Sequence, residues 1–297
     1  MDTRQLSAFC EVVDRKSFSQ AAEHLGVTQP AVSLQVRSLE DRVGQRLLDR
    51  SGRRVEPTEA GISLYRHARR LLQVEQQMLD DLAEAETGNL HGTLAIGAST
   101  GPGAHLVPLL LCEFQREHPD LRVSLSISDT HTVTEQVAAR ELELGVVGAH
   151  GRHRSLDFEP LSLDEIVLAV PPGHPSAGGR MTLDELRAQT LVVMQEGAGV
   201  RQVVDEELRH AGLRVRDLDA KLVLGLQESV KSAVGAGYGV TFISRTAVER
   251  ELETGVLGMA RVEGIEPARQ IYFVRGRGRA LTRAADAFLG FAREHVD

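Results

Sequence analysis

The chain has 297 residues and a formal net charge of −8, so it is long enough for two or three domains that each bury their own core. The net negative charge argues against a protein that binds nucleic acid over its whole surface. Charges throughout the first twenty residues, and the lack of a long apolar run, argue against a secretory leader and a membrane span. Cys10 and Cys112 lie in apolar helical contexts and are expected to be buried, reduced thiols, which predicts a cytoplasmic protein.

Short helices separated by tight turns are predicted over the first sixty residues. The apolar positions of the first helix recur at helical spacing: Leu6, Phe9, Cys10 and Val13. Ser19 is expected to cap a second helix, which ends at Gly26 because glycine tolerates the left-handed conformation at a helix end.

A third helix is predicted to start with Thr28 as its cap and Pro30 in its first turn. Its core stripe consists of Val32, Val36, Leu39 and Val43. The residues that project from the other side, beginning at the helix N-terminus, are Pro30, Ser33, Leu34 and Arg37. An apolar residue such as Leu34 on that side fits a DNA groove, where it can contact a thymine methyl, and it equally fits a single solvent-exposed leucine.

A local basic strip follows within residues 41–70, although the whole chain is acidic. Its members are Arg42, Arg46, Arg50, Arg53, Arg54, Arg66, Arg69 and Arg70. Arginine makes planar, bidentate contacts to phosphate and guanine, so this strip is a candidate nucleic-acid contact.

A single helix of about 28 residues, roughly 40 Å long, is predicted from Thr58 to about Thr87. Its apolar residues include Leu64, Ala68, Leu71, Met78, Leu82 and Ala85. The length and the width of this seam favour a dimerising linker helix over a helix that packs only on its own domain.

Beyond residue 92 the pattern changes to alternating strands and helices, which predicts βαβ units and a parallel sheet. Two similar α/β halves are expected, joined by extended crossings near residues 160–165 and 262–268. Ligands usually bind in the cleft between such halves, at the ends of the strands.

The N-terminal residues resemble those of the LysR-type transcriptional regulators. The matching positions are Phe9, Val12, Ser17, Phe18, Ala21, Ala22, Leu25, Val27, Thr28, Gln29, Pro30, Ala31, Val32, Ser33, Leu39, Glu40, Gly44, Leu47, Arg50, Thr58, Ala60 and Gly61. Leu48 departs from the family's usual Phe. The cleft-facing segments resemble relatives that control carbon fixation or sulfur assimilation.

This resemblance implies an N-terminal all-α winged helix-turn-helix with a long linker helix, and a C-terminal α/β domain of two subdomains with a fold like periplasmic binding proteins. The expected boundaries are 1–58 for the DNA-binding domain, 59–90 for the linker, and 91–297 for the effector-binding domain. Subdomain I would comprise 91–162 and 267–297, and subdomain II 163–266.

The resemblance also implies that residues 18–37 form the helix-turn-helix and that its second helix enters the major groove. Together with the exposed side of that helix, this gives the predicted DNA contacts Thr28, Gln29, Pro30, Ser33, Leu34, Arg37, Arg50 and Arg53. Arg50 and Arg53 would lie on or near the wing.

An effector site is expected where strands of the α/β domain end. The predicted effector contacts are Ser99, Thr100, Gly101, Thr130, Gly148, Gly197, Gly199 and Arg201. Ser99 and Thr100 would equally serve as ordinary helix caps. Many relatives carry Ser and Thr where this chain has Ala198 and Val200, so two hydroxyl donors are missing. The effector is therefore expected to be smaller, less polar, or held more by backbone and Arg201, and an anionic effector such as a carboxylate is a hypothesis.

The expected function is therefore that of a sequence-specific transcriptional regulator, modulated by its effector, with no cofactor and no enzymatic activity. Its expected partners are double-stranded operator DNA, the effector, and further copies of the chain, as a dimer and then a dimer of dimers. RNA polymerase is a candidate partner, and no membrane is expected.

Four other interpretations carry less weight. His150 and His153 lie in a charged loop and supply too few ligands for a closed metal site. The glycines of residues 235–239 lead into a strand, whereas a dinucleotide fingerprint follows a strand and opens a helix. The chain shows no motif that supplies a nucleophile and a base, which argues against an enzyme fused to a DNA-binding domain. The substitutions Ala198 and Val200 leave open an architectural DNA binder whose effector domain no longer binds a ligand.

Overall fold

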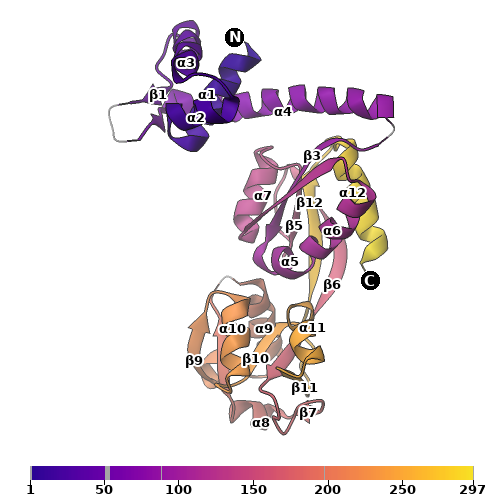
Figure 1. Ribbon diagram of the computed structural model, residues 1–297. Coiled ribbons are helices and arrows are strands. Elements are labelled where there is room, and N and C mark those ends of the chain that lie inside the picture. The colour runs from indigo at the N-terminus through magenta and orange to yellow at the C-terminus, as the bar shows by residue number, and fades with distance from the viewer. Residues whose placement is uncertain (1, 51–53, 88, 197, 297) are drawn as a thin grey trace. The chain divides into compact units, whose positions relative to one another are not determined.

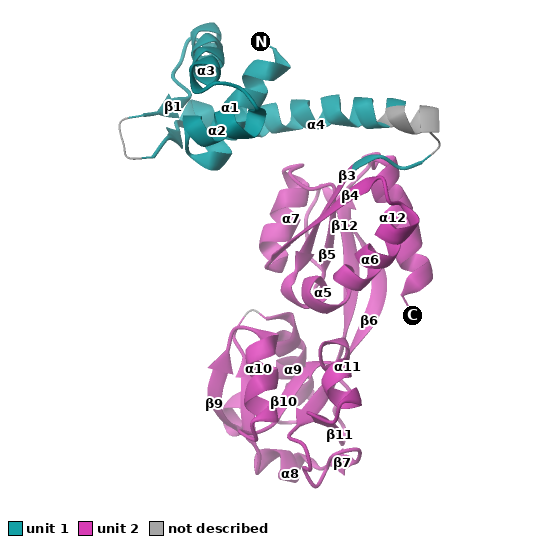
Figure 2. Ribbon diagram, in the orientation of Figure 1, with its two compact units in different colours: residues 1–92 teal, residues 93–297 magenta. Residues whose placement is uncertain are grey.

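The computed structural model describes residues 2–50, 54–87, 89–196 and 198–296. The chain divides into two compact units, residues 1–92 and 93–297 (Figure 2). Within the described residues, no helix combines the length and the apolar character that spanning a membrane requires.

The first unit begins with three short helices, α1 (Thr3–Arg15), α2 (Phe18–Leu25) and α3 (Gln29–Val43) (Figure 1). Leu6, Phe9 and Cys10 of α1 are buried, as the helical spacing predicts, in one core with α2 and α3. Burial raises the pKa of the Cys10 thiol to about 12, so this cysteine stays protonated and unreactive.

The second helix is capped by Ser17 and not by Ser19. The Ser17 hydroxyl accepts a hydrogen bond from the amide of Gln20, and Ser19 falls inside the first turn. The expectation was wrong because the helix starts one residue after Ser17, at Phe18. Gly26 ends the helix at φ +66°, as predicted.

Helix α3 has the two sides that its sequence predicts. Val32, Val36 and Leu39 are fully buried, whereas Leu34 is 68% exposed. Val43, expected on the core stripe, is 39% exposed, because it occupies the last turn before Gly44 and extends past the core. One face of the helix is therefore exposed to solvent and does not pack against the core of its own domain.

A short two-stranded wing follows, formed by β1 (Leu48–Asp49) and β2 (Glu56–Pro57), which pair antiparallel. The next helix, α4 (Glu59–Thr87), packs tightly beneath it at Gly61. A Cβ atom on Gly61 would lie 2.0 Å from the carbonyl oxygen of Leu47, so only glycine fits.

Helix α4 has 29 residues, close to the predicted length. Ala68 is buried and Leu64 packs against the core of the first unit. Further along, Leu71, Met78 and Leu82 are exposed, and the side chain of Ala85 lies outside the described residues. The distal half of the seam thus stays uncovered in a single chain.

The second unit is built on one mixed sheet of eight strands. Seven of them follow the order β4-β3-β5-β12-β6-β11-β7, and β10 also pairs with β6. Their bounds are β3 (Gly92–Ser99), β4 (Leu121–Ser128), β5 (Leu144–Val147), β6 (Leu156–Val170), β7 (Arg180–Met181), β10 (Thr241–Ser244), β11 (Gly258–Val262) and β12 (Ala268–Gly276). The sheet is not wholly parallel as predicted, because β12 returns antiparallel to both β5 and β6.

Helices cover the sheet in both halves of this unit. In the half that we call subdomain I they are α5 (Thr100–His105), α6 (Val107–Glu117), α7 (Thr130–Ala138) and α12 (Arg283–His295). Cys112 of α6 is exposed and not buried as expected, because Leu110, Leu111 and Phe114 form the buried side of that helix.

The other half, subdomain II, adds a separate pair of parallel strands, β8 (Thr190–Met194) and β9 (Asp219–Leu224). Its helices are α8 (Leu183–Arg187), α9 (Gly199–His210), a 3-10 turn (Val215–Asp217), α10 (Gln227–Gly235) and α11 (Arg245–Glu253). Apolar clusters pack on both faces of its sheet.

Two long strands connect the halves (Figure 1). β6 pairs with β12 from Leu156 opposite Gly276 to Glu165 opposite Ala268, and then continues to pair with β10 and β11. The extended crossings predicted near residues 160–165 and 262–268 are thus the middle of β6 and the entry into β12. Residues on these two strands lie at the junction of both subdomains.

Candidate DNA-binding and effector-binding sites

The N-terminus of α3 presents the residues predicted to read DNA. Ser33 is half-buried, and the other five predicted contacts in this region are exposed: Thr28, Gln29, Pro30, Leu34 and Arg37. Thr28 stands at the N-cap position, and among the described residues its hydroxyl makes no capping hydrogen bond. The hydroxyl is therefore free to bond outside the domain, to a base edge or a phosphate.

Glu40 fixes the start of the wing to α3. Its Oε1 accepts the amides of Leu47 (2.9 Å) and Leu48 (3.2 Å), and its Oε2 accepts a hydrogen bond from Nη2 of Arg50 (2.9 Å). The guanidinium of Arg50 also stacks over the ring of Phe18 at 4.9 Å. Arg50 is thus held in a defined place beside α3, while Arg53 lies outside the described residues.

A cavity of about 330 Å³ opens between the two subdomains. The residues that line it are Ser99, Thr100, Gly101, Asp129, Thr130, Gly148, Met194, Gln195, Glu196, Ala198, Gly199, Val200, Gly225, Gln227 and Arg269. It brings together six of the eight predicted effector contacts, from Ser99 to Gly199. Gly197 lies outside the described residues, and Arg201 is not among the lining residues.

The hydroxyls of the first cluster bond across strands. Ser99 Oγ accepts the amide of Gly148 (3.1 Å), and Thr100 Oγ1 donates to the carbonyl of Ser128 (3.3 Å). Among the described residues the side chain of Ser99 makes no capping hydrogen bond, although it stands at the N-cap of α5. Ordinary helix capping therefore does not account for this buried serine.

Asp129 occupies the rim of the cavity and caps α7. Its carboxylate accepts hydrogen bonds from the amide (2.9 Å) and the hydroxyl (2.6 Å) of Thr132. The bonds from Thr132 lower the pKa of this carboxyl, so it stays ionised. Glu196 is a second exposed carboxylate at the rim.

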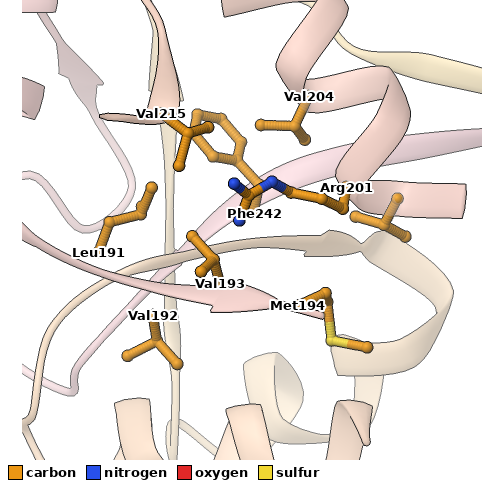
Figure 3. Close-up of a pocket in the computed structure, with 9 residues that line it drawn as sticks. Leu191, Val192, Val193, Met194, Arg201, Val204, Val215 and Phe242 are labelled. Carbon is orange, nitrogen blue, oxygen red and sulfur yellow. The ribbon is translucent and has the colours of Figure 1, made fainter. Parts of the chain in front are cut away.

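Arg201 lies in a different recess, one of only about 10 Å³ within subdomain II (Figure 3). Its Nε donates to both carboxylate oxygens of Asp205, at 2.8 and 2.9 Å, and Val204 and Phe242 line the same recess. The position of Arg201, two residues after Gly199, suggested that its side chain would point into the cavity. The side chain instead runs along α9 and pairs with Asp205 one turn further on.

Arg269 is the cationic residue that does line the cavity, and the sequence analysis missed it. It lies at the start of β12, more than one hundred residues from its partner Asp164 on β6. Nothing in the local pattern marks it, because only the antiparallel return of β12 brings it to the cleft.

A polar bridge joins the subdomains beside the cavity. His105 of α5 contacts Gln227 of α10, with 3.0 Å between Nε2 and Oε1. Burial lowers the pKa of His105, and the nearby positive charge of Lys231 lowers it further. Burial also acts to lower the pKa of Lys231, but the hydrogen bonds that Lys231 donates to Glu228 (2.7 Å) and Glu251 (2.9 Å) outweigh it and raise that pKa overall.

No cluster of three potential metal ligands occurs among the described residues. His150, part of the pair weighed as a metal motif, stacks with Phe158 at 4.9 Å and Tyr272 at 5.3 Å. His153 instead lies 4.0 Å from Glu135. The two imidazoles thus have separate packing partners.

Comparisons with known proteins agree with this architecture. The model of the bacterial regulatory helix-turn-helix protein of the lysR family matches residues 3–62, and that of the LysR substrate binding domain matches residues 87–297. The chain is 33% identical over 289 residues to the RuBisCO operon transcriptional regulator of Allochromatium vinosum, which covers 97% of this chain and 94% of the relative.

Two solved structures illustrate the shared fold. Full-length CbnR complexed with its target DNA superimposes with a TM-score of 0.73 at 23% identity, over 99% of both chains. The regulatory domain of Synechocystis CcmR in complex with 2-PG gives a TM-score of 0.62 at 21% identity, over 70% of this chain and 100% of that domain.

The matched regions leave only residues 1–2 and 63–86 outside the two family models, and the unmatched stretch at 63–86 lies within α4. The family consists of regulators and not of enzymes; its members bind operator DNA and small-molecule effectors and they oligomerise. The chain belongs to the LysR family of bacterial transcriptional regulators and is a DNA-binding regulator with an effector-binding domain.

Proposed function

We propose that this regulator reads its operator with the exposed face of α3 and that an effector bound between the subdomains changes its DNA binding or its activation of promoters. The observation that carries the proposal is that each unit has one surface whose polar groups are left unused. On α3 these are exposed side chains, and in the second unit they are buried groups around a cavity of about 330 Å³.

The DNA contacts divide by chemistry. Gln29, Pro30, Ser33 and Leu34 would enter the major groove, where base edges and thymine methyls are read. Thr28, Arg37, Arg50 and Arg53 would reach phosphates and position the helix. The hydrogen bonds that Glu40 accepts from Leu47 and Arg50 support this assignment, because they hold Arg50 beside α3.

The effector contacts would be Ser99, Thr100, Gly101, Thr130, Gly148 and Gly199, from both sides of the cavity. A volume of about 330 Å³ suits a small molecule at the lower end of ordinary ligand sites. We propose an anionic effector, since CcmR, whose regulatory domain shares this fold, was solved with 2-PG. Gly197, whose structure is not described, remains a proposed contact from the sequence.

Self-association would proceed through α4. Leu71, Met78 and Leu82 form an exposed apolar seam on a 29-residue helix, which a second copy would cover. We propose a dimer that pairs again into a dimer of dimers, located in the cytoplasm, with RNA polymerase as a further partner. The domain boundaries proposed are 1–58, 59–90 and 91–297, with subdomain II at 163–266.

Genes for carbon fixation are the first candidates for its targets. The support is the name of a relative that shares a third of its residues over nearly the whole chain, the RuBisCO operon regulator of Allochromatium vinosum.

Titration with two kinds of DNA tests the reading surface. Ser33→Ala should lower the preference for the DNA upstream of the regulator's own gene over random DNA, by about 1–3 kcal/mol at the position read. Arg53→Ala should weaken binding to both DNAs alike, because phosphates carry no sequence information. Equal effects of both substitutions on both DNAs would contradict the assignment and favour an architectural DNA binder.

A further inference from the structure

The guanidinium of Arg269 is anchored at one end only. Its Nε donates to Oδ2 of Asp164 at 2.8 Å, and the two side chains are only 7% and 8% exposed. The other oxygen of Asp164, Oδ1, accepts a hydrogen bond from the buried hydroxyl of Ser244 at 2.6 Å. Both oxygens of the carboxylate are thus engaged, and Arg269 meets it through Nε rather than through a bidentate pair.

Three glycines make room for the free end of this side chain. A Cβ atom on Gly101 would lie 2.6 Å from Nη2, and Cβ atoms on Gly148 and Gly199 would lie 3.0 and 2.7 Å from Nη1. All three glycines and Arg269 line the cavity. Nη1 and Nη2 therefore lie against the backbone of these glycines at the cavity wall. No side chain at Gly101, Gly148 or Gly199 separates the two nitrogens from the cavity.

The free end of Arg269 lacks acceptors. A guanidinium has five N–H donors, and Asp164 takes the one on Nε. Among the described residues none accepts a hydrogen bond from Nη1 or Nη2. Buried charged donors without acceptors are costly, so this arrangement calls for an acceptor that comes from outside the protein.

Two further donors face the same space. Ser99 is buried, and its Oγ accepts the amide of Gly148, which leaves the hydroxyl proton to donate elsewhere. Helix α9, of 12 residues, starts at the cavity behind Ala198, which has no side chain with which to cap it. The uncapped first turn presents free amides and the positive end of the helix.

Negative charge near the cavity lies at its rim. Asp129 is committed to Thr132, and both Asp129 and Glu196 are exposed. The charge of Asp164 lies behind the guanidinium and is already paired. The buried groups Arg269 and Ser99 and the first turn of α9 therefore offer donors to the cavity, whereas the carboxylates that line it are exposed.

We infer that the effector presents an oxyanion, a carboxylate or a phosphate, to Nη1 and Nη2 of Arg269 and to the hydroxyl of Ser99. This inference rests on the proposed effector role of the cavity and names the residue that selects the effector's charge. Two parallel N–H bonds to one oxyanion are stronger and more directional than a point-charge contact. Asp164 and Ser244 are positioning residues, because Ser244 bonds Asp164, Asp164 orients the guanidinium, and neither lines the cavity.

The same geometry links binding to the arrangement of the subdomains. Arg269 and Asp164 lie on the crossing strands, Gly101 and Gly148 belong to subdomain I, and Gly199 belongs to subdomain II. An anion on Arg269 contacts both sides of the cleft at once, and it favours the cleft geometry in which those contacts can be made together.

The test measures binding of three small probes to the full chain by calorimetry: inorganic phosphate, glycolate, and ethylene glycol as the uncharged match of glycolate. We expect one or both anions to bind at a single site, and ethylene glycol to bind at least about tenfold more weakly than glycolate or not at all. The better anion identifies the head group as phosphate or carboxylate.

Two variants then address Arg269. Arg269→Lys keeps the charge beside Asp164 but loses the paired donors, and Gly101→Ala keeps every charge while placing a methyl group against Nη2. Each should weaken anion binding at least about tenfold. Arg245→Lys is the matched control, because Arg245 is exposed and pairs with Glu165, the neighbour of Asp164. It should leave anion affinity unchanged.

Several results would overturn the inference: equal binding of ethylene glycol and glycolate, unchanged anion affinity in both Arg269→Lys and Gly101→Ala, or a loss caused instead by Arg201→Lys. Failure of both anions to bind up to about 50 mM, well above the millimolar affinity of even a weak site, would also overturn it. Titration of the same variants with DNA distinguishes failure of this inference from failure of the proposed function. If sequence-specific DNA binding persists, the role as a regulator stands even when the anion site does not.

Discussion

The two recognition regions of this regulator are built in opposite ways. The proposed reading face of α3 comes from one continuous helix, and its side chains are exposed because the other side of the same helix forms the core. The proposed effector cavity is assembled from segments that lie between residues 99 and 269, and its cation, Arg269, is only 7% exposed.

This difference matches what each region must bind. DNA is large and approaches from outside, so a rigid helix with an exposed face is enough. A small effector instead needs a cavity that buries most of its surface and offers a few well-placed polar groups. Substitutions on the exposed face of α3 should therefore change DNA binding with little effect on the free energy of unfolding. Substitutions of the buried groups at the cavity should change both effector binding and the free energy of unfolding.

The largest effect expected from this contrast concerns Asp164. Asp164→Ala leaves the buried guanidinium of Arg269 without its carboxylate and should lower the free energy of unfolding of the second unit by about 3–5 kcal/mol. Glu165→Ala is the matched control: Glu165 is the next residue and forms an exposed pair with Arg245 at 2.8 Å. Its loss should cost at most about 1 kcal/mol.

Calorimetric unfolding of the two variants measures this difference. If Asp164→Ala costs no more than Glu165→Ala, the buried pair does not support the junction of the subdomains, and the contrast with the DNA-reading region fails.

The next effect separates the two sides of α3. Leu39 is fully buried, so Leu39→Ala should destabilise the first unit by about 2–5 kcal/mol. Leu34→Ala removes the same atoms from a residue that is 68% exposed and should change stability by less than about 0.5 kcal/mol. It should instead weaken binding to operator DNA.

Denaturant unfolding together with DNA titration checks both halves of this prediction. A large loss of stability in Leu34→Ala, or operator affinity that does not change in it, would show that the exposed side of α3 is not a reading face.

The smallest effect concerns pH and the bridge between the subdomains. Burial lowers the pKa of His105 in the folded chain below its ordinary value of 6.5. The unfolded chain therefore binds this proton more readily, so the stabilisation from a neutral His105 is present above about pH 6.5 and is lost as the pH falls below it. Unfolding measured between pH 8 and pH 5, roughly the range in which histidine titrates, should show this loss.

His105→Gln removes the titrating group while it keeps a side chain able to bond Gln227, so its stability should depend less on pH over that range. Lys231, Glu228 and Glu251 surround the bridge and are the same in both proteins. Identical pH profiles for the wild type and the variant would show that His105 does not titrate in this way.

The first unit was predictable from the sequence because its pattern is local. The stripe of Val32, Val36 and Leu39, the exposed Leu34 and the length of α4 all follow from helical spacing. The errors there were also local: Ser17 replaces Ser19 as the cap, and Val43 lies one turn beyond the core.

The effector cavity was predictable only in part. Turns such as 99–101 could be recognised because strands end there, and the structure brings them together. Arg269 could not, because it reaches the cleft only through the antiparallel pairing of β12 with β6. Arg201 pairs with Asp205 along its own helix, a direction that sequence proximity to Gly199 did not show.

We expect an anion bound in the cavity to change how the first unit occupies DNA. Footprinting of the full chain on the DNA upstream of its own gene, with and without a panel of small anionic metabolites, tests it most directly. We expect protection that shortens or shifts with one anion in the wild type and stays unchanged in Arg269→Lys. Salt-sensitive binding without sequence preference, or protection that no anion alters, would contradict it.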